Sequence, residues 1–290
     1  GNKKIGKYFA VYELANKSAK EEANELKSIF PNAKETAEVE KYITKIESIE
    51  AAKRASARRI TAVLPYFMYS RSDKKDQPRV PVTAKLMAKL IEAAGADRII
   101  TCDLHNSAIQ SYFEINCDTL TGSTLLKNYF QSKNLEDIVV VATDAGSSKR
   151  AYKYSRFLNC PMALIDKRRK GNDDNAVATN IIGDIKDKTA LIFDDEISTG
   201  GTLVEAIKIC KEHGAKEIYA GATHGIFAGD AIKKIKKSPV KELVVTNTVP
   251  LDKKNKIDKI TTLSIAPLFA EAIRRINEGQ PLGDMFMYDK

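Results

Sequence analysis

The sequence predicts an α/β fold of two similar halves, each a mainly parallel sheet flanked by helices. Two apolar runs without polar alternation, Ile138–Ala142 and Thr189–Phe193, are typical of parallel strands covered on both faces. The halves share a repeat, because Gly95-Ala96-Asp97-Arg98-Ile99 recurs as Gly214-Ala215-Lys216-Glu217-Ile218, and each copy closes a helix and opens a strand. We therefore expect domains over residues 1–120 and 121–290, with a C-terminal helix that can pack back on the first.

The composition favours small anionic ligands over nucleic acid. The 290 residues carry a formal charge of +9, but the cations are interleaved with 38 acids and form no stripe with aromatics. The cysteines at 102, 117, 160 and 210 are far apart, so we expect buried free thiols and a reducing compartment. No secretory signal and no apolar run near the ~18 residues of a membrane span are seen, so we expect a soluble, cytoplasmic protein.

The first half is lysine- and glutamate-rich at its start, where Ser18-Ala19-Lys20-Glu21 has capping-box spacing and predicts a helix to about Phe30. A helix over Ile49–Ala57 and a strand over Ile60–Leu64 follow. The next segment, Pro65–Pro81, is a long loop with aromatics that suit a base and cations that suit phosphates. Ligands gather at the carboxyl ends of strands in open α/β sheets. A solvated basic loop is the alternative.

The helix Thr83–Ala94 and the strand Arg98–Cys102 follow this loop, and the strand leads into Asp103-Leu104-His105. A histidine at a strand end beside an acid can ligate a metal or meet a phosphate. We expect His213 to cap a helix. For His224 a structural and a functional role stay equally open.

Two polar turns of the second half follow apolar strands. The strand Ile138–Ala142 leads into a turn with Asp144, Gly146 and two serines and then a helix over 149–158, a pattern that suggests a Mg²⁺ or phosphate contact. The strand Met162–Ile165 leads into Lys167-Arg168-Arg169-Lys170 and a polar loop. A mobile cationic loop that closes on a polyphosphate has this composition. The alternative is a solvated charge run.

The third turn, Asp194 to Thr202, is the most informative. Its glycines allow several N–H groups to converge at the start of a helix that Gly214 ends, and helix N-termini bind anions. The acids would repel a bare phosphate, so a sugar phosphate fits better. Its phosphate would lie on Ser198–Thr202, while Asp194 and Asp195 accept hydrogen bonds from ribose hydroxyls or hold a divalent ion. An acidic surface turn is the alternative.

The strand, the two acids and Thr199-Gly200-Gly201-Thr202 resemble the phosphoribosyl-diphosphate (PRPP) loop of type I phosphoribosyltransferases and PRPP synthases. From about Ile49 onward, the order of motifs resembles ribose-phosphate diphosphokinase, the PRPP synthase family; the matching stretches are Pro65–Lys75, Asp103–His105, Asp144–Ala151, Lys167–Arg169 and Asp194–Thr202. This resemblance implies two phosphoribosyltransferase-like domains. It also implies a transferase that passes the diphosphoryl group of ATP to the 1-hydroxyl of ribose 5-phosphate, giving PRPP and AMP for nucleotide biosynthesis.

The resemblance implies roles for individual residues. The catalytic residues would be Lys167 and Arg169, with Mg²⁺ held by His105 and Asp144. The residues that would bind ATP are Arg71, Ser72, Asp73 and His105, and those that would bind ribose 5-phosphate are Asp194, Asp195, Ser198, Thr199, Gly200, Gly201 and Thr202. The implied partners are these substrates and further copies of the chain, in a homodimer-based assembly such as a hexamer, without nucleic acid or membrane.

The chain departs from the family pattern mainly on the ATP side. We find no N-terminal Phe-x-Asp-Gly-Glu segment, and the stretch before Ile49 is shorter than the pattern needs. Ser72 replaces a Gln, Ser147 a second Gly and Ser198 a common third acid. Two other functions stay open. A phosphoribosyltransferase would keep the Asp194–Thr202 loop without needing ATP, and a non-catalytic regulatory homologue would keep only the fold.

Overall fold

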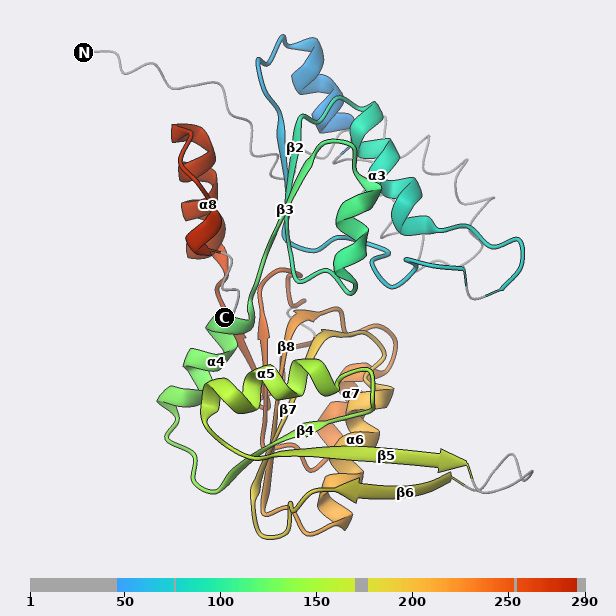
Figure 1. Ribbon diagram of the computed structural model, residues 1–290, viewed down its shortest axis with the longest axis vertical. Coiled ribbons are helices and arrows are strands. Elements are labelled where there is room, and N and C mark those ends of the chain that lie inside the picture. The colour runs from blue at the N-terminus through green and yellow to red at the C-terminus, as the bar shows by residue number, and fades with distance from the viewer. Residues whose placement is uncertain (1–45, 76, 170–176, 253–254, 286–290) are drawn as a thin grey trace. The chain divides into compact units, whose positions relative to one another are not determined.

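The structure is a computed structural model that describes residues 46–75, 77–169, 177–252 and 255–285 (Figure 1). For residues 167–169 and 177–179 it describes the backbone. The described residues form two compact units, one from 46 to 120 together with 271 to 285 and the other from 121 to 270. The helix expected from Ser18 lies outside the described residues.

The first unit contains a parallel sheet in the order β1-β2-β3, formed by β1 (Thr61–Leu64), β2 (Arg98–Cys102) and β3 (Asn116–Leu120). Its helical segments are residues 46–54, α3 (Thr83–Ala93), the 3-10 helices η1 (Ser107–Tyr112) and η3 (Gly283–Met285), and the later part of α8 (Ala266–Glu278). The predicted bounds of β2 are confirmed, and α3 ends one residue earlier than expected.

The start of the β1–α3 loop belongs to the core of this unit. Phe67 and Met68 are buried, and the Phe67 ring lies edge-on to Phe113 with 5.6 Å between the ring centroids. Tyr66 and Tyr69 are half-buried against the same cluster. The expectation that the aromatics of this loop stack on a base is therefore wrong for Phe67, because its ring fills the core.

The second unit contains a seven-stranded sheet in the order β10-β9-β8-β7-β4-β5-β6. Its strands are β4 (Ile138–Ala142), β5 (Met162–Arg169), β6 (Val177–Ile182), β7 (Thr189–Ile197), β8 (Glu217–Gly225), β9 (Glu242–Thr246) and β10 (Ile260–Leu263). The pairing of β5 with β6 is antiparallel, and the other pairs are parallel. Its helices are α4 (Ser123–Ser132), α5 (Ser148–Leu158), α6 (Gly201–Glu212) and α7 (Ala231–Lys237).

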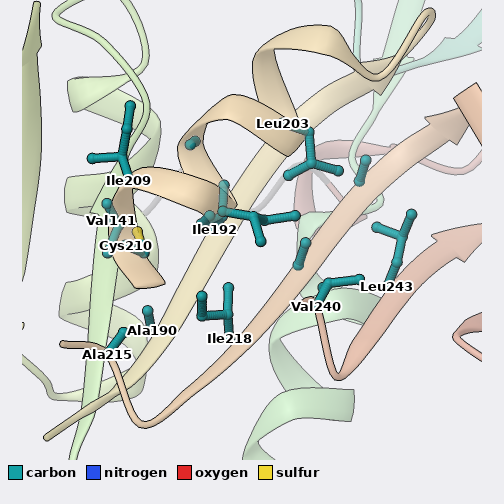
Figure 2. Close-up of a cluster of buried hydrophobic side chains, with 14 of the residues drawn as sticks. Val141, Ala190, Ile192, Leu203, Ile209, Cys210, Ala215, Ile218, Val240 and Leu243 are labelled. Carbon is teal, nitrogen blue, oxygen red and sulfur yellow. The ribbon is translucent and has the colours of Figure 1, made fainter. Parts of the chain in front are cut away.

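Helices cover both faces of this sheet, as the unbroken apolar runs predicted. Alternate residues of β7 serve the two faces: Ile192 packs in the cluster with α6 and α7, and Phe193 packs in the cluster with α4 and α5. Figure 2 shows part of the first cluster, to which Ile192 of β7, Leu203 of α6 and Ile218 of β8 all contribute.

The direction of strand addition reverses between β4 and β7. From β4 the chain adds β5 and β6 on one side, then returns to place β7 against the other side of β4 and continues with β8, β9 and β10. In open α/β sheets, ligands bind outside the carboxyl ends of the strands at such a switch point. The turns after β4 and β7, which carry Asp144 and Ser198–Gly200, therefore flank the expected ligand position.

Two strands are longer than the sequence predicted. We expected β7 to end at Phe193, but it continues to Ile197, since β8 stays in register with Asp194 opposite Ala222 and Glu196 opposite His224. We expected β5 to end at Ile165, but antiparallel pairing with β6 extends it to Arg169. Lys167 and Arg169 therefore lie within a strand, just before residues 170–176, which the structure does not describe.

The sequence repeat corresponds to a repeated local structure. Gly95 and Gly214 both have left-handed backbones, with φ of 102° and 85°. Two residues after each glycine, a backbone N–H donates to the carbonyl of the residue just before the neighbouring strand. Asp97 donates to Ile60, before β1, at 2.8 Å, and Lys216 donates to Lys188, before β7, at 2.9 Å. The predicted α/β fold with two similar halves is thus confirmed at this junction.

Candidate active site

The turn between β7 and α6 leaves a helix N-terminus open to a ligand. Gly200 precedes α6 with φ 71°, a left-handed conformation that glycine adopts without strain. Gly200, the N-cap residue of α6, makes no side-chain capping hydrogen bond, and Thr199, Gly201 and Thr202 are exposed. The first N–H groups of an α-helix have no partner within the helix, so this turn can bind an anion.

Backbone hydrogen bonds from the segment between β8 and α7 fix the position of this turn. The N–H groups of Ile226 and Phe227 donate to the carbonyl of Ile197 at 3.0 and 3.1 Å, and the N–H of Ala228 donates to that of Ser198 at 3.0 Å. Gly225 is required here, because a Cβ at this position would lie 2.6 Å from Cε2 of Phe227. These hydrogen bonds could not be predicted from the sequence, because they depend on β8 lying next to β7.

Arg150 joins the two acids at the end of β7. This residue of α5 forms ion pairs and hydrogen bonds with the carboxylates of both Asp194 and Asp195. The N–H of Asp195 also donates to Oδ1 of Asp194 at 2.9 Å. The Arg150 side chain is 30% exposed and that of Asp195 is 9% exposed, so the contact is largely shielded from water. The sequence motif Asp144–Ala151 contains Arg150, but its pattern does not indicate this role.

Burial and neighbouring charges shift the pKa of Asp194 from that of an exposed acid. Burial raises the pKa of Asp194 to about 6, the Arg150 guanidinium opposes this rise, and the adjacent Asp195 adds to it. Arg150 therefore favours the charged form of Asp194, which burial disfavours. Charged carboxylates accept hydrogen bonds from hydroxyl groups, which is the chemistry expected for a sugar.

Asp144 lies in the turn after β4, at the same switch point. Its Oδ1 accepts a hydrogen bond from the N–H of Ser147 at 2.7 Å, while the Ser147 hydroxyl donates to the Asp144 carbonyl at 2.9 Å. Asp144 is exposed, so it remains open to a ligand from solution. Ser147, which stands where the family pattern has a glycine, thus holds this turn in place.

The predicted ATP-side residues lie together in the first unit but differ in exposure. Arg71 and His105 are exposed. Ser72 is half-buried and donates through its hydroxyl to Oγ1 of Thr83 at 3.3 Å. Asp73 is buried, and its Oδ2 accepts a hydrogen bond from Nδ2 of Asn106 at 2.8 Å.

The predicted metal residues, His105 and Asp144, belong to different units. Within the described ranges, no three or more His, Cys, Asp or Glu side chains form a group that could hold a metal ion. Mg²⁺ commonly takes several of its ligands from substrate phosphates and water.

The environments of His213, His224 and the cysteines indicate structural roles. The Nδ1 atom of His213 lies 2.9 Å from the Ile209 carbonyl at the end of α6, which confirms the predicted cap. His224 is buried, with Nδ1 2.9 Å from Oγ1 of Thr248, which favours its structural role. All four cysteines are free, as expected, but only Cys102 and Cys210 are buried. Burial raises the pKa of the Cys210 thiol to about 12, so it is inert near neutral pH.

Comparisons with known proteins agree with the motifs. The model for the N-terminal domain of ribose phosphate pyrophosphokinase matches residues 29–95, and that for the phosphoribosyl synthetase-associated domain matches residues 173–287. A ribose-phosphate pyrophosphokinase of Caldanaerobacter subterraneus subsp. tengcongensis is 53% identical over 240 residues, which span 82% of this chain and 75% of that protein. The chain belongs to the ribose-phosphate pyrophosphokinase family. The expected enzyme class, a ribose-phosphate diphosphokinase, is thereby confirmed.

Other members of the family match to a similar extent. The ribose-phosphate pyrophosphokinase of Bacillus subtilis is 47% identical over 238 residues, which span 82% of this chain and 75% of that protein. The crystal structure of phosphoribosylpyrophosphate synthetase from Mycobacterium smegmatis matches with a TM-score of 0.78 and 38% identity, covering 83% of this chain and 78% of that one. The fold class is therefore that of a ribose-phosphate pyrophosphokinase.

No helix in the part of the chain that the structure describes is long and apolar enough to cross a membrane.

Proposed function

We propose that this chain transfers the diphosphoryl group of ATP to the 1-hydroxyl of ribose 5-phosphate, giving PRPP and AMP. Membership in the ribose-phosphate pyrophosphokinase family supports this reaction. The observation that carries the ribose 5-phosphate half is the open start of α6 next to the two acids that Arg150 holds. A phosphoribosyltransferase is disfavoured, because the family match extends over 82% of the chain and not over the PRPP loop alone.

Ribose 5-phosphate would bind across the β7–α6 turn. Its phosphate would accept hydrogen bonds from the first N–H groups of α6 and from the hydroxyls of Ser198, Thr199 and Thr202, with Gly200 and Gly201 allowing the close approach. The helix dipole adds about 0.3–1 kcal/mol to such binding. The ribose hydroxyls would donate to Asp194 and Asp195, which separates the acids from the phosphate and resolves the repulsion noted from the sequence.

ATP would bind on the first unit through the exposed side chains of Arg71 and His105. Both segments follow carboxyl ends of parallel strands, β1 and β2, where α/β sheets place ligands. Ser72 and Asp73 belong to the same stretch, but hydrogen bonds to Thr83 and Asn106 engage their side chains. Since Arg71 and His105 are exposed whereas Ser72 is half-buried and Asp73 is buried, we propose that Arg71 and His105 make the more direct contacts with ATP.

Catalysis would depend on positioning and charge. The 1-hydroxyl oxygen of ribose 5-phosphate attacks the β-phosphorus of ATP and gives up its proton to solvent. The bond from that phosphorus to the bridging oxygen of AMP breaks, and negative charge shifts onto the AMP phosphate. Lys167 and Arg169 would stabilise the transferring group, because interactions stronger in the transition state than in the ground state speed the step. The backbones of both residues belong to β5, which pairs with β6 there.

Mg²⁺ would meet the protein at Asp144 and His105. An exposed carboxylate oxygen is a suitable ligand for this hard cation, and the ion would otherwise be held by ATP phosphates and water. When bound, it neutralises part of the charge of the polyphosphate.

We also propose a homodimer-based oligomer and a cytoplasmic location. The family resemblance supports the first, and the four free cysteines support the second. Sedimentation would check the oligomer.

Calorimetry with ribose 5-phosphate tests the ligand assignment. Asp195→Ala and Thr199→Ala should weaken binding while the fold is kept. Lys208→Ala, on the exposed side of α6, is the matched control and should leave affinity unchanged. Unchanged affinity in both site variants would show that the turn does not bind this ligand.

A further inference from the structure

We infer that Asp73 is a positioning residue, which fastens the β1–α3 loop carrying Arg71 to the segment between β2 and η1 that carries His105. This inference rests on the proposed role of these two segments in ATP binding. In this role Asp73 acts through Asn106 and Tyr112 of the same chain, and not through the contact with ATP that the family resemblance implies.

The contacts of Asp73 join the loop to both ends of η1. Its Oδ2 accepts a hydrogen bond from Nδ2 of Asn106, the residue that precedes η1, at 2.8 Å. Its backbone carbonyl accepts a hydrogen bond from the hydroxyl of Tyr112, the last residue of η1. Asn106 is fixed in turn, because its Oδ1 accepts from the N–H of Ala108 at 3.0 Å. Asp73 is thus hydrogen-bonded to a residue at each end of η1.

The burial of Asp73 opposes a direct role with ATP. Asp73 is 7% exposed, although Arg71, Lys74 and Lys75 around it are exposed. A carboxylate that faced the polyphosphate would repel it, whereas a carboxylate directed inward leaves the neighbouring cations to meet the ligand. Its partner is an amide, which supplies a directional hydrogen bond, and burying a carboxylate without such a bond is costly.

Both candidate ATP contacts lie next to this link. Arg71 is two residues before Asp73, and His105 immediately precedes Asn106. The loop is also tied to α3, because the Ala84 N–H donates to the carbonyl of Ser72 at 3.2 Å. Loss of the Asp73–Asn106 bond should therefore shift the two contacts relative to each other without unfolding the loop.

A double-mutant cycle separates this role from a contact with ATP. If the two residues act as one link, Asp73→Ala and Asn106→Ala should each lower kcat/KM for ATP by about 10- to 100-fold, the scale of a misplacement of ~1 Å. The double variant should lose no more than either single variant, because their effects are coupled. KM for ribose 5-phosphate should change by less than about twofold in all three.

Two further variants keep the test independent of folding. Asp73→Asn keeps an acceptor oxygen for Asn106 and should retain most of the wild-type kcat/KM for ATP, whereas a residue that acts through its charge would not be rescued. Ser111→Ala removes a hydroxyl of η1 that donates to Ala108 and not to Asp73, so it is the matched control and should behave as wild type. Circular dichroism and Tm confirm that each variant is folded at the assay temperature.

The outcomes discriminate between the possible roles. Coupled losses with rescue by Asp73→Asn support the positioning role. Additive losses, or a loss of ATP binding in Asp73→Ala but not in Asn106→Ala, would overturn it while leaving the proposed reaction intact. A wild-type protein that forms no PRPP from ATP would instead contradict the proposed function itself.

Discussion

Replacing Arg150 with methionine should weaken ribose 5-phosphate binding through the acids at the end of β7. Methionine keeps much of the length of the side chain but removes the guanidinium that bonds both Asp194 and Asp195. Hydrogen bonds to charged groups are worth about 1.5–3 kcal/mol each, and breaking a fully buried ion pair costs about 3–5 kcal/mol. Because the Arg150 side chain is 30% exposed, water recovers part of this loss.

We therefore expect a net loss of about 1.5–3 kcal/mol in the site, which corresponds to roughly a 10- to 100-fold weaker affinity for ribose 5-phosphate. Arg150→Lys should recover little, since an ammonium group cannot bond two carboxylates in the planar fork geometry. Calorimetry with ribose 5-phosphate at low ionic strength measures the change. Arg156→Met, in the last turn of the same helix, is the control. Wild-type affinity in Arg150→Met would refute the assignment of Arg150 as the residue that organises the acids.

Further predictions concern pH, catalysis, metal and backbone. Burial raises the pKa of Asp194 to about 6, and Arg150 opposes the rise, so wild-type affinity for ribose 5-phosphate should fall as the pH drops through about 6. In Arg150→Met this fall in affinity should begin at higher pH. An affinity that does not change between pH 5 and 8 would argue against the role of Asp194. Lys167→Ala and Arg169→Ala should each lower kcat by at least ~10² with small changes in KM, and Arg168→Ala, which is offset from them by one position along the run of cations, should lose less. Activity should vanish with a chelator and return with Mg²⁺ or Mn²⁺, so turnover in excess chelator would rule out the metal. Gly225→Ala should lower stability by about 1–3 kcal/mol in chemical denaturation, because the new methyl group meets the Phe227 ring at 2.6 Å, whereas Gly283→Ala has open space and should be neutral.

The sequence predicted the fold where the physical signal was local. Parallel strands covered on both faces must be apolar on both faces, so Ile138–Ala142 and Arg98–Cys102 were recognised with their observed bounds. The sequence predicts β5 and β7 too short, because the residues directly after Ile165 and Phe193 are charged. Hydrophobicity does not report the hydrogen bonds with β6 and β8 that extend the two strands. The phosphate turn after β7 was recognised from its glycines and hydroxyl residues, which depend on local backbone geometry alone.

The contacts of the site that the sequence does not indicate depend on the order of the strands in the sheets. Arg150 is 44 residues from Asp194 in sequence, and only the adjacency of β4 and β7 brings them together. In the same way, the bond between Asp73 and Asn106 requires β1 and β2 to be neighbours. Composition and spacing identify polar residues in turns, but they do not indicate whether a given side chain faces the ligand or its own protein partner.

The central claim is that this chain moves the diphosphoryl group of ATP to ribose 5-phosphate, and following the phosphorus in the products tests it most directly. Phosphorus-31 NMR of the protein with ATP, ribose 5-phosphate and Mg²⁺ would resolve each product, with ATP alone as the control. We predict AMP and PRPP in equal amounts, formed only when ribose 5-phosphate is present. Formation of ADP, or of AMP without an equal amount of PRPP, would contradict the proposed reaction.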